Sequence, residues 1–443
     1  MRKSKKPSLS TTSLETIERA VGIEEYIASS PGIGGKIKES EDDFLVEEIL
    51  DADLRDNGTY LIVKVKKKNW DTMNFARILS NYLHISRNAI GYAGTKDKRA
   101  ITIQYFSIPV KSNDIMDKIR NARIKDAHIE IAGYMNRKIK LGDLLGNKFR
   151  IVVRSPSQPE NLQRILDELE IKGIPNFFGI QRFGTLRFIT HEVGRLILRK
   201  NYSEAFWVYV AMPSELEDEE IRKIREDLWN ERNPKMGLRE LPKYLIYERN
   251  LLQKLREGKS ELQALISLPK NLKLMFIHAY QSYIFNRILS ERIREYGTLK
   301  TLEKGDYADF LKRKKGYSIN SGDFVEIGDT NFRRVKFLAE NRYAFLALPV
   351  PGYETKFEGW SGEKLKEILE MEGLNLDSFR GEYPEFSSRG SFRTAEVPFD
   401  FESFMTEYHN ELLVFSFFLP KGCFATSFLR EVMKSDYSYF LKK

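Results

Sequence analysis

The sequence predicts a protein of the α/β or α+β class, because strand and helix patterns alternate along its first half. The runs 43–48 (DFLVEE) and 60–68 (YLIVKVKKK) alternate in polarity and are rich in β-branched and aromatic residues, as half-buried strands are. Apolar residues then recur at helical spacing between 75 and 83. We expect the two strands to lie at the edges of a sheet.

The helix is marked by its cap and by its apolar face. Asp71 or Thr72 supplies the N-cap. The apolar face comprises Phe75, Ile78, Leu79, Tyr82 and Leu83. Another strand is predicted at 149–154 (FRIVVR), and the helix after it has an apolar stripe of Leu162, Ile165, Leu166 and Leu169. This order of elements excludes an all-β domain.

A second domain is predicted after residue 184. Helical patterns lengthen there, an acidic stretch occupies 214–220, and basic clusters follow at 311–316 and 332–336. The chain has 443 residues, of which 42% are hydrophobic, which is enough for two cores of ordinary size.

The two ends of the chain differ in character. The run 411–420 (ELLVFSFFLP) predicts a buried strand, followed by a short helix that opens near Ser427. A strand this close to the end needs a sheet to join, and the first domain supplies one. Residues 1–20 are dominated by Ser, Thr and Lys and predict a loosely ordered arm.

Composition limits the class of protein. Lys and Arg total 72 against 63 Asp and Glu, and the net charge of +9 weakly favours a nucleic-acid partner. The single cysteine, Cys423, permits neither an intramolecular disulfide nor a thiolate metal cluster. No secretory signal and no run of 18 apolar residues occur. We expect a soluble cytoplasmic protein with no membrane anchor.

Several familiar sites are excluded by their residues. The segment 29–35 (SSPGIGG) lacks the third glycine of a dinucleotide fingerprint. The segment 51–58 (DADLRDNG) begins like a calcium loop, but Arg55 and Ile62 occupy ligand positions. The histidines, His84, His128, His191, His278 and His409, lack the spacing of a zinc site or a nucleophile pair. Any catalysis must therefore use carboxylates, lysines or hydroxyls.

The segment 91–109 (GYAGTKDKRAITIQYFSIP) is the most informative part of the chain. Small residues permit a tight backbone before Asp97, which is flanked by Lys96, Lys98 and Arg99. Nearby positive charge favours an ionised, nucleophilic carboxylate. From these residues alone, a solvated surface turn remains the alternative.

This segment resembles the catalytic motif of the TruD family of pseudouridine synthases, archaeal members in particular. A Lys–Asp pair precedes a small residue, a Thr and a Gln, which here are Lys96, Asp97, Ala100, Thr102 and Gln104. Four further blocks keep the family's order: KESEDDFLVEE from Lys38, LGDLLGNKF ending at Phe149, GIPNFFGIQRFG at 173–184 and LPKGCFATSFLRE at 419–431. Matches are looser between 185 and 395, where ALPVPG at 347–352 is the clearest.

The resemblance implies a fold and an activity. The fold is a catalytic domain with a mixed, largely antiparallel sheet of the pseudouridine synthase type, formed by 1–184 and 396–443, with an α/β TRUD domain inserted at 185–395. The activity is an isomerase reaction that turns uridine into pseudouridine in tRNA, at position 13 in the D-arm. The reaction breaks the N1–C1′ bond and joins C5 to C1′ without redox change, so no cofactor and no metal are expected. The implied partner is tRNA or another structured RNA, with no obligate protein partner.

The resemblance also implies roles for residues. Asp97 would be the nucleophile, attacking either C1′ of the ribose or C6 of the base. Lys38 would pair with it and hold the carboxylate ionised in a water-poor site, the alternative being a surface lysine at a strand edge. Phe149 would stack on the target base, where related families place a Tyr, unless it is a core residue. The other expected pocket residues are Asn147, Phe44 and Phe424.

The target nucleotide must leave its stack, at a cost of roughly a few kcal/mol that backbone contacts have to offset. Candidate contacts are the basic clusters 64–68, 137–140 and 311–315, together with Lys96. Arg182 is expected to contact phosphate or to link the two domains. Two alternatives stay open: a non-catalytic RNA-binding or RNA-folding protein, and a synthase that acts on a different RNA.

Overall fold

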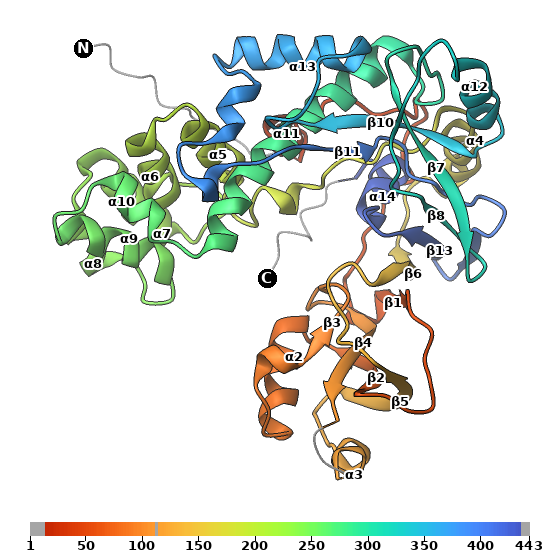
Figure 1. The fold of residues 1–443 in the computed structure, drawn as a ribbon, viewed down its shortest axis with the longest axis horizontal. Coiled ribbons are helices and arrows are strands. Elements are labelled where there is room, and N and C mark those ends of the chain that lie inside the picture. The colour runs from red at the N-terminus through yellow and green to blue at the C-terminus, as the bar shows by residue number, and fades with distance from the viewer. Residues whose placement is uncertain (1–13, 111–113, 436–443) are drawn as a thin grey trace.

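The computed structural model describes residues 14–110 and 114–435 and is built around an eight-stranded sheet (Figure 1). Its strands are β1 (Phe44–Leu50), β2 (Tyr60–Lys68), β3 (Gly91–Tyr92), β4 (Ile101–Pro109), β5 (Ala127–Met135), β6 (Leu144–Arg154), β12 (Met405–His409) and β13 (Leu412–Pro420). They follow the order β12-β13-β6-β1-β4-β2-β5, with β3 paired to β4. Only β1 and β4 run parallel among these strands. The predicted mixed, largely antiparallel sheet is confirmed.

The strands expected at the sheet edges instead lie inside the sheet. β1 is hydrogen-bonded to β6 on one side and to β4 on the other, and β2 lies between β4 and β5. Buried and half-buried side chains alternate strictly along β1. Such alternation shows that one face of a strand is covered, but it carries no information about how many strands pair with it. The expectation that β13 joins this sheet is confirmed by its ladder with β6.

Helices cover the sheet where the sequence predicted them. The N-cap of α2 (Thr72–Tyr82) is Asp71, whose carboxylate accepts a hydrogen bond from the amide of Asn74 at 2.9 Å. The predicted stripe of α4 (Leu162–Lys172) is buried, and α3 (Ile115–Asn121) packs on β5. The last helix is α14 (Ala425–Met433). No helix in the described part of the chain is long and apolar enough to cross a membrane.

The chain between α4 and β12 builds a helical lobe and a smaller sheet (Figure 1). Its helices are α5 (Thr190–Leu198), α6 (Tyr202–Ala211), α7 (Glu219–Glu231), α8 (Pro234–Glu240), α9 (Ile246–Arg256), α10 (Glu261–Ile266), α11 (Lys270–Tyr296), α12 (Phe332–Glu340) and α13 (Gly359–Met371). The smaller sheet contains β7 (Tyr307–Lys314), β8 (Tyr317–Asn320), β9 (Val325–Glu326), β10 (Ala344–Val350) and β11 (Ser391–Thr394). All of these elements fall within the predicted insertion 185–395, whose boundaries stay a prediction.

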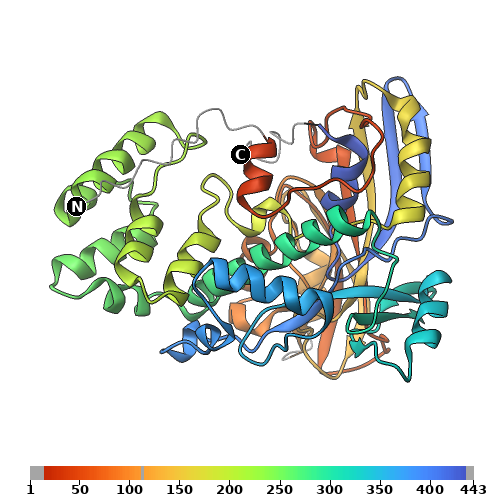
Figure 2. The same ribbon diagram turned by 90° about the horizontal axis from the view of Figure 1, so that it is seen from above.

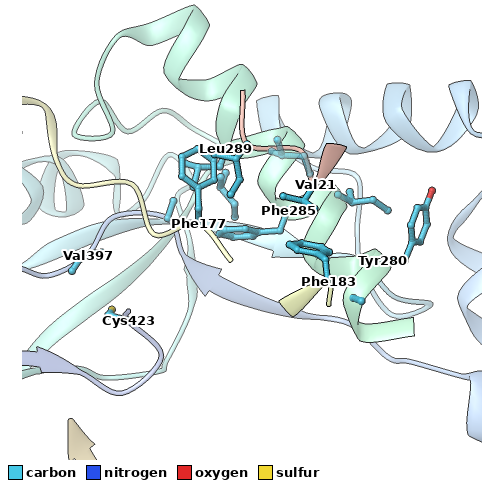
Figure 3. Close-up of a cluster of buried hydrophobic side chains, with 14 of the residues drawn as sticks. Val21, Phe177, Phe183, Tyr280, Phe285, Leu289, Val397 and Cys423 are labelled. Atoms are coloured by element: carbon cyan, nitrogen blue, oxygen red, sulfur yellow. The ribbon is translucent and has the colours of Figure 1, made fainter. Parts of the chain in front are cut away.

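One hydrophobic core runs across the junction of the two predicted domains. It joins Ile151 of β6 and Phe415 of β13 to Phe285 of the long helix α11. Figure 3 shows the part where Phe285 meets Phe177, together with side chains from the N-terminal segment and from the chain before β12. Apolar packing, in addition to the chain connections, therefore holds the inserted segment against the larger sheet.

The N-terminal residues that the structure describes are packed against the last helix. Glu18 of α1 (Leu14–Ala20) receives two hydrogen bonds from Arg430 of α14, at 2.8 and 3.0 Å. Arg430 also pairs with Glu431 at 2.9 Å, and none of the three side chains is more than 6% exposed. The expected loose arm is therefore wrong for 14–20, where a buried ion pair and the buried Ile17 fix the helix. Residues 1–13 lie outside the described part. In the view from above (Figure 2), α1 is the red helix, and α14 lies near it in blue.

Loss of this ion-pair cluster should destabilise the fold. We expect Arg430→Ala to lower the free energy of unfolding by about 3–5 kcal/mol, because it leaves two buried carboxylates without a cation. The matched control is Arg294→Ala. Arg294 also contacts three carboxylates but is 45% exposed, so its loss should cost below about 1 kcal/mol. Urea unfolding followed by circular dichroism measures both, and equal losses would contradict the prediction.

Candidate active site

Three of the four side chains expected around the base, Phe44, Asn147 and Phe149, lie on one face of the larger sheet. In the ladders of β6, Phe149 lies opposite Val46 of β1 and Phe417 of β13, while Asn147 lies opposite Glu48 of β1. Directly paired residues of neighbouring strands share a face, and every second residue of a strand returns to it. Three strands that are distant in sequence therefore present their side chains to one side.

Lys38 and Asp97 meet above this face, although 59 positions separate them in the chain. Lys38 Nζ lies 3.1 Å from Asp97 Oδ2 and 4.3 Å from the centre of the Phe44 ring. Phe44 in turn makes an edge contact with Phe149, with ring centres 6.2 Å apart. The structure thus brings together four of the predicted site residues. The ammonium interacts with both the carboxylate and the face of an aromatic ring.

The two members of the ion pair differ in their exposure to water. The Lys38 side chain is 6% exposed, whereas that of Asp97 is 58% exposed. The alternative of a surface lysine at a strand edge is therefore wrong. The expectation of a water-poor environment is correct for the lysine and wrong for the carboxylate of this chain on its own.

The turn that carries Lys38 is fixed by a second acid. Lys38 has a positive φ of 56°, and the short helix Glu41–Asp43 follows it before β1 begins. Asp43 accepts a hydrogen bond from the Ser40 amide at 2.8 Å and two from Arg154, at 2.9 and 2.6 Å. These bonds tie the turn to the end of β6, which holds Lys38 in an uncommon backbone conformation over Phe44.

The loop that carries Asp97 is anchored by its neighbour Lys96. Lys96 Nζ lies 2.8 Å from Glu48 Oε2, and the two side chains are 7% and 0% exposed. Burial raises the pKa of Glu48 above its ordinary value, while Lys96 acts in the opposite direction. Lys96 was expected to contact RNA, and the structure places its ammonium inside the protein instead. A buried pair of this kind binds the loop firmly to β1.

Neutral hydrogen bonds hold the same loop from the other side. The Lys96 amide donates to Thr72 Oγ1 at 2.8 Å, and this hydroxyl donates to Gln104 Oε1 at 3.0 Å. Gln104 Nε2 donates to the carbonyl of Gly94. The family residues Gln104 and Lys96 thus act on the backbone around Asp97, and the first turn of α2 takes part through Thr72.

Lys67 is a buried lysine close to this hydrogen-bond network. Its Nζ donates to Thr102 Oγ1 at 2.7 Å and to the Trp70 carbonyl at 2.8 Å, and the residue is 1% exposed. Burial, with a smaller contribution from Lys96, lowers the pKa of Lys67 to about 8. Within the described part of the chain, no carboxylate lies within ion-pair distance of it. Lys67 is therefore a buried cation held by neutral oxygens.

The base pocket residues have surroundings that suit a flat ligand. Phe149 is half-buried and stacks on Phe417, with ring centres 5.4 Å apart, so it serves the core and faces the site at once. Asn147 is also half-buried, and its Oδ1 has no hydrogen-bond partner in the described part of the chain. A buried acceptor without a donor is costly unless a ligand supplies the donor.

A cavity of about 550 Å³ adjoins the loop that carries Asp97. Its wall includes Thr95, two positions before Asp97, and the predicted pocket residue Phe424, which is 46% exposed. The segment 177–182, from the GIPNFFGIQRFG block, supplies the opposite wall together with Met275 of α11. The structure therefore places Phe424 at this cavity, together with Thr95 from the loop of Asp97.

The expected RNA contacts have varied surroundings. Arg182 donates to Ser282 of α11 at 3.3 Å, which links the QRFG block to the inserted segment. In the cluster 64–68, Lys64 pairs with Glu47 and Lys68 pairs with Asp42. In the cluster 311–315, Lys314 and Lys315 pair with Asp51 and Asp53 next to β1. Two of the four cations in each of these runs are therefore paired with an acid of the protein itself.

Glu48, Lys67 and Thr72 were not singled out from the sequence as parts of the site. The alternation in 43–48 and 60–68 contained a signal for two of them. Glu48 has the parity of Phe44 and Val46, and Lys67 has that of Val63 and Val65, so both charges fall on covered positions. Charged residues at such positions are paired or hydrogen-bonded, which marks them for a structural role near a site.

The fold and the site together define a class of protein: an α+β enzyme that carries an exposed carboxylate paired with a buried lysine. The described residues contain no group of three or more His, Cys, Asp or Glu that could hold a metal ion. The family model described as tRNA pseudouridine synthase D (TruD) matches residues 20–432. The match spans both predicted domains.

Relatives agree with the family model over nearly the whole chain. A protein of Archaeoglobus fulgidus named as a tRNA pseudouridine synthase D is 57% identical over 425 residues, which are 95% of this chain and 100% of the relative. A protein of the same name from Pyrococcus abyssi is 36% identical over 92% of this chain and 98% of its own. The crystal structure of the Methanosarcina mazei protein, also named for TruD, has a TM-score of 0.80 at 36% identity, covering 95% and 98% of the two chains. The chain belongs to the TruD family, and it is an isomerase, as the sequence predicted.

The buried charge of Lys67 should make stability depend on pH in a specific direction. Its pKa is about 8 in the fold against 10.5 in the unfolded chain, so between these values the unfolded chain holds more protons. Wild-type stability should therefore rise with pH across this window, by about 2–3 kcal/mol relative to Lys67→Met. Urea unfolding at pH 8 and pH 10.5 measures the difference. The control Lys66→Met, which removes an exposed neighbouring lysine, should keep the wild-type pH dependence. If the stability difference between wild type and Lys67→Met is the same at both pH values, the prediction is wrong.

Proposed function

We propose that this protein converts a uridine of tRNA, at position 13 in the D-arm, into pseudouridine, with Asp97 as the nucleophile. The observation that carries the proposal is the ion pair of Lys38 and Asp97 beside the Phe44 and Phe149 rings. The names of the relatives support tRNA as the substrate. The cytoplasm, where tRNA is modified, is the proposed location.

The proposed reaction needs an ionised carboxylate and no external group. The N1–C1′ bond breaks, the uracil turns, and the C5–C1′ bond forms, while the hydrogen leaving C5 is balanced by the one gained at N1. Attack at C1′ of the ribose and attack at C6 of the base both require Asp97 in its charged form. Lys38 supplies the positive charge that favours that form, and it is fixed before the substrate arrives.

The RNA would complete the site by covering Asp97. The carboxylate is 58% exposed, so a flipped nucleotide has direct access to it. A uracil laid against Phe149 would bring its N–H and carbonyl groups towards Asn147, whose unpartnered Oδ1 can accept the N3–H. Exclusion of water by the base would then strengthen the attraction between Lys38 and Asp97.

The alternative of a non-catalytic RNA-binding protein fits these observations less well. The loop of Asp97 is held by the buried Lys96–Glu48 pair and by the Thr72–Gln104 hydrogen bonds. Such positioning of one carboxylate gives a binding protein no advantage, because a negative charge repels the RNA backbone. A synthase that acts on a different RNA is distinguished by mapping the product.

Removal of the nucleophile should abolish the product without loss of binding. We expect Asp97→Asn to lower the rate of pseudouridine formation in a tRNA transcript by about 10³-fold or more, with tRNA affinity almost unchanged. Carbodiimide-dependent reverse-transcription stops map the product, and gel shift measures binding. The control is Asp56→Asn at an exposed position of the same lobe. An active Asp97→Asn enzyme would contradict the assignment of the nucleophile.

Lys38 should be needed for rate more than for affinity. We expect Lys38→Met, which keeps most of the length of the side chain, to slow conversion by about 10²-fold because it removes the charge beside the carboxylate. Single-turnover kinetics with excess enzyme separates the rate of conversion from RNA binding. Lys36→Met, two positions earlier and exposed, should behave as wild type. Equal effects of the two substitutions would rule out a specific role for Lys38.

A further inference from the structure

A second cavity lies beside the one that adjoins the loop of Asp97. It has a volume of about 620 Å³, and its walls come from the segment 176–182, α11, the smaller sheet and the turn 421–423 before α14. Phe178 and Arg182 line both cavities, so the two share a wall. None of the site residues predicted from the sequence other than Arg182 lines this second cavity.

The second cavity is rich in cations that lack an acid partner. Among the described residues, Arg182, Arg393 and Lys421 have no carboxylate within ion-pair distance. Arg393 donates to the backbone carbonyl of Asn176 at 3.1 Å and to its side-chain oxygen at 2.8 Å, and it lies over the Phe178 ring at 4.1 Å. These contacts orient the guanidinium without neutralising it. Burial lowers the pKa of Arg393 only to about 10, so it stays charged at neutral pH.

The acid of this cavity does not cancel these charges. Asp309 is 1% exposed and accepts four hydrogen bonds, all from uncharged donors. The donors are Asn320, Thr394, Ser321 and the amide of Gly322, at 2.7 to 3.0 Å. A carboxylate satisfied in this way is part of the wall. Three cations against one acid leave the cavity positive, which suits a phosphodiester.

Aromatic rings complete the wall of the cavity. Phe324 and Phe392 contact each other with ring centres 5.8 Å apart, and both are half-buried, as is Phe178. Half-buried rings beside unpaired arginines form the combination that binds unstacked bases of single-stranded nucleic acid. The volume of 620 Å³ is within the range of small-ligand sites and admits a base with its ribose and phosphate.

We propose that this cavity binds a second unstacked nucleotide of the same RNA, close in sequence to the target uridine. Its phosphate would lie against Arg182, Arg393 and Lys421, and its base against Phe324 and Phe392. The shared wall of Phe178 and Arg182 puts this nucleotide next to the cavity that adjoins the loop of Asp97. The second nucleotide would hold the RNA backbone in place while the target uracil turns. The inference rests on the proposed RNA substrate.

The test pairs RNA bases with cavity residues. A set of tRNA transcripts is made, and each lacks the base at one of the positions within two nucleotides of the target uridine. Single-turnover pseudouridine formation is then measured on each transcript. For wild type, one of these abasic transcripts should react about tenfold more slowly, the loss of one base–aromatic stack. Phe324→Ala should show a loss of similar size on the intact transcript and no further loss on that abasic transcript.

Two further variants keep the test independent of folding defects. Ser391→Trp adds bulk at an exposed position of the cavity wall, and it should also slow the intact transcript. Phe337→Ala, which removes a 63% exposed ring of α12 that does not line the cavity, should behave as wild type.

The outcomes separate the two proposals. If wild type is active but the effects of Phe324→Ala and of every missing base simply multiply, the cavity does not bind a neighbouring base and the inference is overturned alone. If wild type converts no uridine in the intact transcript, the proposed function fails first and the inference with it. A single position at which the two losses do not multiply, with Phe337→Ala unaffected, supports the second nucleotide site and identifies its occupant.

Discussion

The buried ion pair between Lys96 and Glu48 is the interaction on which the geometry of the site depends. It joins the loop of Asp97 to the strand that begins at Phe44, and both side chains are almost completely removed from water. Loss of the partner of a buried charge is strongly destabilising, so the loop has few alternatives to the observed position. The Thr72–Gln104 hydrogen bonds then fix the remaining freedom of the loop, and Asp97 is left facing Lys38.

The sequence was sufficient for features that depend on neighbours in the chain. The strands at 44–50 and 60–68 and the cap at Asp71 follow from alternation and from local hydrogen bonding. The position of β1 between β6 and β4 could not be predicted in this way, because its partners lie more than 50 residues away. The pairing of Lys38 with Asp97 came from family resemblance, since no periodicity connects them. A solvated surface turn was the alternative for the cations around Asp97, yet the Lys96 side chain is buried because its partner Glu48 comes from β1.

The basic runs were misleading for a related reason. A run such as 311–316 shows positive charge but not the position of the acids, which are supplied here by Asp51 and Asp53 from the other predicted domain. The hairpin of β7 and β8 also stacks Tyr317 on Phe418, with ring centres 4.5 Å apart. These contacts tie the inserted segment to the larger sheet. Other cations without an acid partner, such as Arg182 and Arg393, lie outside these runs, and their positions depend on tertiary structure.

Lys38 and Asp97 differ in exposure, and under the proposed function this difference leaves the RNA to complete the site. Folding removes Lys38 from water. The contacts of its ammonium with the Phe44 ring and the Asp97 carboxylate offset the free-energy cost of this burial. The carboxylate stays solvated, so the free protein avoids the cost of burying both charges. Binding of a flipped base would complete the removal of water only when the substrate is in place. The attraction that holds Asp97 would then grow at the moment when its charge and orientation matter, because the local dielectric constant falls around a pair that is already aligned.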